Sequence, residues 1–490
     1  MKKIVSLVLA LCLMLSLTAF AQAESEKVTI NLWRCTFNLA SVDSARTQEV
    51  EDAINAYIAD KINVQIKLTD VVSGEYADKV NLALANNEIN LLWTASWEAV
   101  IGTNDLVPAK AVYDITDLLA DTTLYNSMDA GQWEATKYDG KNYFIPVYKD
   151  NVEGYDFMFR ADLVEKYGWD ITTVTKLADL EPMLEDALND GLKYPFLTQK
   201  TAMFYRWYID SFDFFTADAN TNFFAIDRET NEVVDTILTD EYKEFCTLMA
   251  EWAEKGYISD DDVNKITGDT TTQTQDWAIS WWTDIPVNAE ANSRYGQDVV
   301  MQNATKRYAH STSALGSCYC VTANSTEEQA KAAIDFMGLL YTDATLADMY
   351  TFGIEGKDFE YTKTEEQTIN HVTQAADATY NHSMWESASA TIVTPLYNEP
   401  DNKAELYKDF NGGAETSVAA GFRFDKTPVE AAYTACSNLF EEYGFALENG
   451  GIPSADVEKT IEEYQAKLDA AGYQDVLAEF QNQYNTWKAQ

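Results

Sequence analysis

Three short runs decide the fold of the N-terminal hundred residues: Val28-Thr-Ile-Asn-Leu-Trp33, Ile62-Asn-Val-Gln-Ile-Lys-Leu68 and Ile89-Asn-Leu-Leu-Trp-Thr94. The first two alternate apolar and polar residues and the third is mostly apolar, so each predicts a β-strand. Between them, apolar residues recur at helical spacing over 50–58 and 76–84. The resulting order β-α-β-α-β is typical of a parallel sheet with helices on its faces.

The rest of the chain continues this α/β pattern and then becomes mainly helical. Asp156-Phe-Met-Phe-Arg160 begins another predicted strand, and residues 152–284 can form a second lobe. A predicted strand over Ser317–Ala323 precedes an amphipathic helix over Thr326–Tyr341. Because 490 residues are too many for one hydrophobic core, we expect two α/β lobes, each a sheet flanked by helices, with a largely helical C-terminal third.

No flexible linker separates the lobes, so we expect the chain to cross between them in ordered segments. Crossings are predicted near Lys149–Gly154, at Thr283–Asn288 and within Phe352–Tyr361. The expected division is a signal peptide over 1–23, the first lobe over 24–150, the second lobe over 151–284, a return to the first lobe over 285–355, and the second lobe with the helical segment over 356–490.

The first residues have the pattern of a secretory signal peptide. Lys2 and Lys3 give a positive start, an apolar run spans 4–17, and Ala21-Gln-Ala23 offers a cleavage site. We therefore expect a secreted, extracytoplasmic protein that begins near residue 24. The alternative is a lipid anchor at Cys12. A lipoprotein signal has a small residue before that cysteine, whereas this chain has leucine.

The charge balance excludes several classes of partner. The chain has 35 basic and 79 acidic residues, a formal net charge of −44. Such a field repels nucleic acid and anionic lipid, and it keeps a secreted protein soluble and monomeric. We expect a monomer with no nucleic-acid partner.

No catalytic motif stands out. The sequence has no G-x-S-x-G elbow, no phosphate-binding loop and no G-x-G-x-x-G turn. Its histidines, His310, His371 and His382, include no i, i+4 pair for zinc. The sequence therefore predicts a binding protein and not an enzyme, with no catalytic residue, metal or cofactor. The cysteines are expected to be small buried hydrophobic residues.

Aromatic residues make up 13% of the chain and gather where loops are expected to meet. Ligands of parallel sheets bind beyond the carboxyl ends of the strands, which directs attention to the loops at Arg34–Asn38 and Ala95–Glu98. In the second lobe, Trp281 and Trp282 are neighbours on a predicted strand and therefore point to opposite faces. Aromatic planes with a few polar groups suit a neutral sugar, whose rings stack on them.

Eight stretches, in this order, resemble a known family: Thr47–Asn55, Leu92–Trp97, Gly140–Pro146, Arg160–Gly168, Trp252–Ile258, Tyr341–Asp343, Gly353–Lys357 and Gly421–Asp425. They are similar to the extracellular solute-binding proteins of ABC sugar importers, in the branch with a C-terminal domain of unknown function. The resemblance implies a periplasmic-binding-protein-like fold of type II and an oligosaccharide as the small-molecule ligand. It also implies that the permease subunits of an ABC importer are the membrane partner.

The resemblance and the strand positions together give a set of candidate ligand-binding residues. Relatives often have a polar residue or tryptophan after the third strand, a carboxylate at the first crossing and a stacking tryptophan in the far lobe. The matching residues are Trp97, Asp150 and Trp282, with Trp281 as the alternative if the strand faces the other way. The remaining candidates are Ser96, Trp33, Arg34, Tyr148 and Trp385.

Three classes of function remain open on the sequence. The first is a sugar-binding receptor. The second is a receptor of the same fold for a peptide or a polyamine, which the acidic charge favours in its cationic form. The third is a secreted carbohydrate-active enzyme or adhesin. A ligand screen separates the first two, and turnover of a glycan separates the third.

Overall fold

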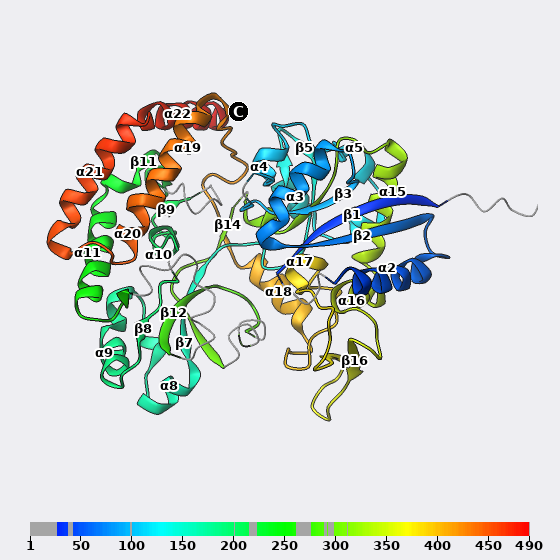
Figure 1. Ribbon diagram of the computed structural model, residues 1–490, viewed down its shortest axis with the longest axis horizontal. Helices are drawn as coiled ribbons and strands as arrows, with labels where there is room; N and C mark the ends of the chain where they lie inside the picture. Colours follow the sequence, from blue (N-terminus) through cyan, green and yellow to red (C-terminus); the bar gives the residue numbers. More distant parts are fainter. Residues whose placement is uncertain are drawn as a thin grey trace, which may run out of the picture.

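A computed structural model describes residues 27–37, 43–98, 100–199, 201–214, 223–260, 276–288, 292, 298–310 and 312–489. Two large hydrophobic cores divide these residues into two lobes that lie side by side (Figure 1). The predicted signal peptide and its cleavage site lie outside the described residues.

The first lobe begins with the predicted alternation of strands and helices. Its N-terminal part comprises β1 (Val28–Thr36), α2 (Ser44–Ile58), β2 (Val64–Val72), α3 (Ser73–Ala85), β3 (Leu91–Thr94), α4 (Thr103–Leu106), α5 (Thr116–Leu119), α6 (Thr123–Asn126), α7 (Ala130–Ala135), β4 (Lys137–Tyr138), β5 (Lys141–Asn142) and β6 (Phe144–Pro146). The three predicted strands and the two predicted helices are confirmed.

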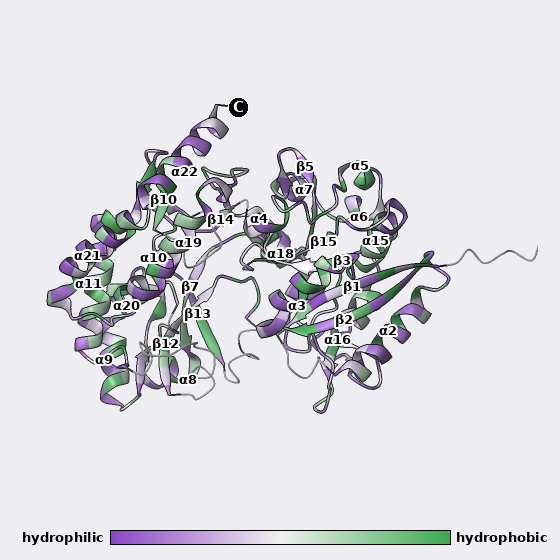
Figure 2. Ribbon diagram, turned by 45° about the horizontal axis from the view of Figure 1, so that its top comes forward, coloured by the Kyte–Doolittle hydropathy of each residue, from purple (hydrophilic) through white to green (hydrophobic). Residues whose placement is uncertain are grey.

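Local sequence explains these elements. In β2, Val64, Ile66 and Leu68 are buried while the residues between them are exposed, as expected of alternating side chains. Helix α2 begins after Asp43, whose carboxylate accepts hydrogen bonds from the first free backbone N–H groups. Figure 2 shows hydrophilic and hydrophobic residues interspersed along β1 and β2.

The second lobe contains a smaller mixed sheet and many helices. Its first part comprises β7 (Tyr155–Arg160), α8 (Ala161–Tyr167), α9 (Glu181–Asn189), β8 (Tyr194–Phe196), α10 (Phe204–Trp207), β9 (Phe212–Asp213), β10 (Phe224–Asp227), β11 (Val233–Asp235), α11 (Asp240–Glu254), β12 (Trp277–Thr283), β13 (Val299–Asn303) and β14 (Tyr308–Ala309). The sheet order is β13-β7-β12-β8.

The chain then returns to the first lobe. This part comprises β15 (Cys318–Val321), α15 (Glu327–Leu340), α16 (Ala344–Phe352), β16 (Phe359–Thr362), β17 (His371–Gln374), α17 (Met384–Ser387) and α18 (Lys403–Gly412). Strand β15 joins the first sheet, whose order is β2-β1-β3-β15-β6, and it pairs antiparallel with both β3 and β6.

The C-terminal segment after residue 412 completes the second lobe. It comprises β18 (Glu415–Thr416), α19 (Glu430–Leu439), α20 (Phe445–Glu448), α21 (Val457–Ala470) and α22 (Tyr473–Lys488). Side chains of α21 and α22, such as Tyr464 and Phe480, are part of the second core. The predicted helical character is confirmed.

The structure places the crossings differently from the sequence prediction in two of three cases. The chain passes from the first core to the second between Tyr148 and Tyr155. Residues 284–288 do reach the first core, where Val287 packs, but the chain then returns to pair β13 with β7. The chain returns to the first lobe only after β14, so residues 299–309 belong to the second lobe. Residues 356–412 pack on the first lobe, because Phe359, Tyr380 and Tyr407 are in its core.

Three crossing segments lie against one another between the lobes. Glu153 and Tyr308 exchange two backbone hydrogen bonds of 2.8 Å, and Tyr308 also pairs with Glu415 of β18. Gly154 allows this close approach, since a Cβ atom there would lie 3.1 Å from the carbonyl oxygen of Lys306.

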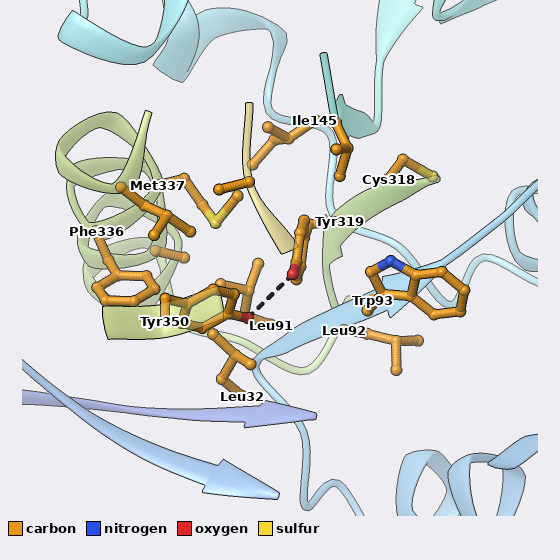
Figure 3. Close-up of a cluster of buried hydrophobic side chains, with 14 of the residues drawn as sticks. Leu32, Leu91, Leu92, Trp93, Ile145, Cys318, Tyr319, Phe336, Met337 and Tyr350 are labelled. Atoms are coloured by element: carbon orange, nitrogen blue, oxygen red, sulfur yellow. Dashed lines mark hydrogen bonds between the residues drawn. The ribbon is translucent and has the colours of Figure 1, made fainter. Parts of the chain in front are cut away.

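The first core fills the space between the sheet and α15–α16 (Figure 3). Tyr319 of β15 and Tyr350 of α16 share a hydrogen bond of 3.0 Å within it, and Trp93 lies at the end of the cluster away from Phe336. The five cysteines of the described chain are buried free thiols, which confirms the prediction. Among the described residues, no helix has both the length and the apolar character of a membrane span.

Candidate ligand-binding site

Strands β1 and β3 run parallel, so their carboxyl ends meet at one edge of the first sheet. Figure 1 shows this edge turned toward the second lobe. Four aromatic side chains gather there, and we call Phe37, Trp93, Trp97 and Trp385 the aromatic patch. Their ring centroids lie between 5.0 and 6.4 Å apart. The ends of two strands and helix α17 therefore build one aromatic surface.

The aromatic patch has a buried base and an exposed rim. Trp93 is fully buried, and its indole N–H donates a hydrogen bond of 2.9 Å to the Ser317 hydroxyl. Phe37 is 42% exposed and Trp97 is 39% exposed. Large apolar side chains exposed together on a soluble protein indicate a contact surface, and flat aromatic rings suit the C–H faces of a sugar.

The Ser96–Trp97 loop is fixed by the segment that returns from the second lobe. The Trp97 indole N–H donates a hydrogen bond of 2.6 Å to the carbonyl of Gly316. Ser96 is buried, and its hydroxyl donates a bond of 2.8 Å to the carbonyl of Thr312. The predicted residue Ser96 thus positions the loop, while the ring of Trp97 stays open to solvent.

The first crossing brings a charged pair to the same place. Lys149 and Asp150 form an ion pair of 3.3 Å with side chains 12% and 13% exposed. A Cβ atom on Gly316 would lie 3.8 Å from Nζ of Lys149. Gly316 therefore lies between Trp97 and the Lys149–Asp150 pair, so the structure brings two predicted residues together. Tyr148 is buried beside them, and its carbonyl accepts a bond of 2.7 Å from the N–H of Ala390.

Two predicted residues lie elsewhere in the first lobe. Arg34 is wholly buried; its Nε donates to Asp70 at 2.5 Å and its Nη1 to the carbonyl of Tyr350 at 2.8 Å. These internal bonds occupy its guanidinium within the first core, contrary to the prediction that it binds a ligand. Trp33 is partly buried against the first core and makes no ring contact with the aromatic patch in the described structure.

A buried carboxylate lies directly below Trp385. Glu386 is the next residue of α17 and is 1% exposed, and its Oε1 accepts a hydrogen bond of 2.9 Å from the N–H of Ser383. Nδ1 of His382 is 3.3 Å from the same oxygen, and Nε2 of His382 is 3.6 Å from Asp70. Polar contacts in the core therefore fix the short helix that presents Trp385.

The two tryptophans of β12 point to opposite faces, as predicted. Trp281 is 9% exposed and lies in the second core, where its indole N–H donates a bond of 3.1 Å to the carbonyl of Thr198. The guanidinium of Arg206 lies 3.8 Å from its ring centroid. Trp282 is partly exposed on the other face of the sheet, beside Met301. Of the pair, Trp282 is the more exposed.

A carboxyl group accompanies Trp282 on the same face. Trp282, Asp156 and Asn303 are direct neighbours across three strands. The amide of Asn303 donates a bond of 2.8 Å to Asp156, and burial together with the charge of Asp284 raises the pKa of Asp156 to about 7. Asp284 in turn pairs with Arg307 of the return segment.

Sequence reasoning missed three residues of these surfaces. Phe37 and Glu98 lie in the two loops that the strand order had marked, but only Arg34, Ser96 and Trp97 were chosen there. Asp156 was assigned to a strand without a role, because the pairing of β7 with β12 and β13 is not visible in the sequence. Within the described part of the chain, no group of three or more His, Cys, Asp or Glu residues is placed to bind a metal.

Two protein-family models match parts of this chain. A model described as bacterial extracellular solute-binding protein matches residues 52–355, and one described as Domain of unknown function (DUF3502) matches residues 418–489. The chain is 24% identical over 442 residues to a carbohydrate ABC transporter substrate-binding protein of Streptococcus pneumoniae serotype 4 (strain ATCC BAA-334 / TIGR4). That alignment covers 88% of this chain and 86% of the relative.

Solved structures share the fold. The N-glycan transport solute binding protein (NgtS) from Streptococcus pneumoniae has a TM-score of 0.79 and 24% identity, covering 94% of this chain and 99% of that chain. An HMO binding ABC-transporter associated protein from Bifidobacterium longum infantis ATCC 15697 has a TM-score of 0.63 and 14% identity, with 94% and 99% covered. The predicted two-lobed α/β fold is confirmed, and with a family match over more than half of its length this chain belongs to the bacterial extracellular solute-binding proteins.

Proposed function

We propose that this protein captures an oligosaccharide between its two lobes and delivers it to the permease of an ABC importer. The observation behind the proposal is the aromatic patch, whose exposed rings of Phe37 and Trp97 lie at the sheet edge that faces the second lobe. A sugar ring has flat C–H faces and a rim of hydroxyl groups, so it needs aromatic planes with polar groups beside them.

The polar groups of the site suit the same ligand. Trp282 stacks on a sugar ring from the second lobe, and Asp150 accepts hydrogen bonds from hydroxyl groups at the first crossing. Carboxylate acceptors form charge-assisted bonds that are stronger than those of neutral groups. The lobes close on the ligand by bending at the crossing segments around Gly154, since a ligand that contacts both lobes binds the closed form better.

Relatives support an oligosaccharide in particular. One relative is a carbohydrate ABC transporter substrate-binding protein. NgtS, which has the same fold, has been solved in complex with Man1GlcNAc and with Man5GlcNAc. We further propose that the mature protein is a secreted, extracytoplasmic monomer, because its signal segment and strong negative charge fit that location and state.

A ligand screen by thermal shift tests the proposal. The panel contains Man1GlcNAc, Man5GlcNAc and kestose, with spermidine and a tetrapeptide as the competing classes. A sugar present at 100 times its Kd stabilises the fold by roughly 2.7 kcal/mol, which raises the melting temperature measurably. Stabilisation by spermidine or the peptide with no response to any sugar would overturn the proposal.

Calorimetry and scattering then test capture and closure. The sugar with the largest shift is expected to bind one site per chain by isothermal calorimetry. Small-angle scattering with that sugar should give a smaller radius of gyration than without it. A labelled glycan incubated with the protein should remain uncleaved, whereas its hydrolysis would indicate an enzyme.

A further inference from the structure

The segment that follows the last crossing is fixed to the second lobe by the C-terminal helix α22. The ring of Phe422 is buried in the second core, with its centroid 5.7 Å from that of Trp487. The side-chain amide of Gln483 exchanges two hydrogen bonds, of 2.8 and 2.9 Å, with the backbone of Asp425. Helix α22 therefore holds residues 422–425 in one position on the second lobe.

Two cationic side chains of this segment reach the first lobe. The guanidinium of Arg423 lies 3.8 Å from the ring centroid of Tyr138, and its Nη2 donates a hydrogen bond of 3.2 Å to the carbonyl of Ala135 at the end of α7. Tyr138 is buried in the first core. The ammonium group of Lys426 pairs with Asp105 of α4 at 2.9 Å. We call these contacts of Arg423 and Lys426 the interlobe tie.

The interlobe tie meets the first lobe at the sheet edge that carries the aromatic patch. The hydroxyl of Thr94, the last residue of β3, donates a bond of 2.6 Å to the carbonyl of Ile101, just before α4. The hydroxyl of Tyr138 donates a bond of 2.8 Å to that of Thr103 within α4. Figure 1 shows α4 on the side of the first lobe that faces the second, near the segment that leads to α19. The tie therefore joins the lobes on the side of the aromatic patch.

A contact at this edge acts in the same sense as a ligand held between the lobes, because both are lost when the lobes move apart. The crossing segments connect the lobes covalently and allow them to rotate, whereas the tie adds contacts that opening has to break. We propose that the interlobe tie limits how far the lobes open, and that holding it in place is a function of the segment over 418–489, which matches a domain of unknown function. Only its effect on sugar affinity rests on the proposed function: a protein held nearer to the closed form binds the sugar more tightly.

Small-angle scattering without ligand tests the tie directly. Arg423→Met/Lys426→Met keeps the apolar stems and removes both charges, so its radius of gyration should exceed that of the wild type. The matched control is Lys243→Met/Lys467→Met, which also removes two positive charges but breaks ion pairs inside the second lobe. Its radius should equal that of the wild type. An unchanged or smaller radius in the tie variant would overturn the inference.

Isothermal calorimetry with Man5GlcNAc then measures the effect on capture. The tie variant should bind roughly fivefold more weakly than the wild type or worse, and the control should bind as the wild type does. Tighter binding by the tie variant would mean that these contacts oppose closure, which overturns the inference. If the wild type binds no sugar and the tie variant is still the more open protein, the proposed function fails and the tie stands.

Charge reversal at the more exposed contact tests the tie without removing Arg423. The side chains of Lys426 and Asp105 are 36% and 24% exposed, so substitutions there should not prevent folding. Lys426→Glu places two carboxylates against each other and should increase the radius of gyration, while Lys426→Glu/Asp105→Lys restores an ion pair and should return it to the wild-type value. A radius that stays unchanged in Lys426→Glu, or that the second substitution does not restore, would overturn the role of this pair.

Discussion

Each lobe buries an arginine, an aspartate and a histidine in contact with one another. In the first lobe, Arg34 lies 2.5 Å from Asp70, and His382 lies 3.6 Å from the same carboxylate. In the second lobe, Arg228 lies 3.2 Å and His310 lies 3.0 Å from Asp213. The same three residue types thus form a compact polar set in both halves of the molecule.

The two sets lie in different places. The first lies beneath the aromatic patch, because His382 also approaches Glu386, the neighbour of Trp385. The second lies at the crossings, since His310 follows β14 and the hydroxyl of Ser417, just after β18, donates to Asp213. Removing charges from water is costly unless they pair and form hydrogen bonds. Each lobe bears this cost where chain segments far apart in sequence must keep a fixed arrangement, one beneath the aromatic patch and one at the crossing segments.

The largest expected effect comes from the first set. Asp70→Asn leaves Arg34, which is fully buried, without its carboxylate, so we expect a loss of about 3–5 kcal/mol in the free energy of unfolding. Denaturant unfolding measures it. The control is Asp190→Asn, which removes an exposed ion pair with Lys166 and should change the free energy of unfolding little. Equal losses in the two variants would contradict the structural role of the first set.

The second set predicts a dependence of stability on acid. Burial by itself would raise the pKa of Asp213, but the charges of His310 and Arg228 lower it to about 2 from an ordinary 3.8. A lowered pKa means that the stabilisation is complete above about pH 4 and is lost as the pH falls through about 2, by about 2 kcal/mol in total.

Urea unfolding of the wild type and of Asp213→Asn tests this. The difference in stability between the two proteins should be largest near about pH 5 and shrink toward about pH 2. The other acidic groups titrate in both proteins, so the difference isolates Asp213. A difference that stays constant with pH would mean that this carboxylate gains nothing from its partners.

The smallest expected effect is the loss of ligand binding in Trp282→Ala, which is best judged against Trp281→Ala on the other face of β12. Trp282→Ala should weaken binding of the sugar at least tenfold, about 1.4 kcal/mol, because a stacking surface is lost. Trp281→Ala should instead lower the unfolding free energy by about 3–5 kcal/mol, since that ring is in the second core. Isothermal calorimetry on both variants measures the change in sugar affinity, and melting curves measure the change in stability. If only Trp281→Ala weakened sugar binding, Trp281 and not Trp282 would be the residue that contacts the sugar.

Much of the fold was predictable from local patterns. The alternation in Ile62–Leu68 fixed the buried face of β2, and the period-two rule placed Trp281 and Trp282 on opposite faces. The crossings after residue 284 were not predictable in the same way. Val287 does reach the first core, so the segment has the composition of a crossing, and only the pairing of β13 with β7 shows that the chain turns back.

The candidate site was also predictable only in part, because some of its contacts exist only in the folded chain. The predicted order of strands and helices was enough to locate Trp97, because the carboxyl end of a predicted strand can be read directly from the sequence. The role of Arg34 depends on Asp70, Tyr350 and Tyr380, which are brought to it only by the folded chain. An arginine that ends an apolar strand has the same appearance in a sequence whether it meets a ligand or a buried carboxylate.

The buried cysteines have a practical consequence for measuring the motion of the lobes. Burial raises the pKa of Cys246 and Cys318 well above the ordinary value, and that of Cys436 to about 11. Thiol reagents attack the thiolate, so the five cysteines of the described chain should react very slowly with maleimides near neutral pH. One new cysteine on an exposed helix of each lobe, for example at Lys79 of α3 and Glu165 of α8, would then take up a pair of dyes selectively. Energy transfer between them would test the proposed closure in a protein that keeps the five buried cysteines.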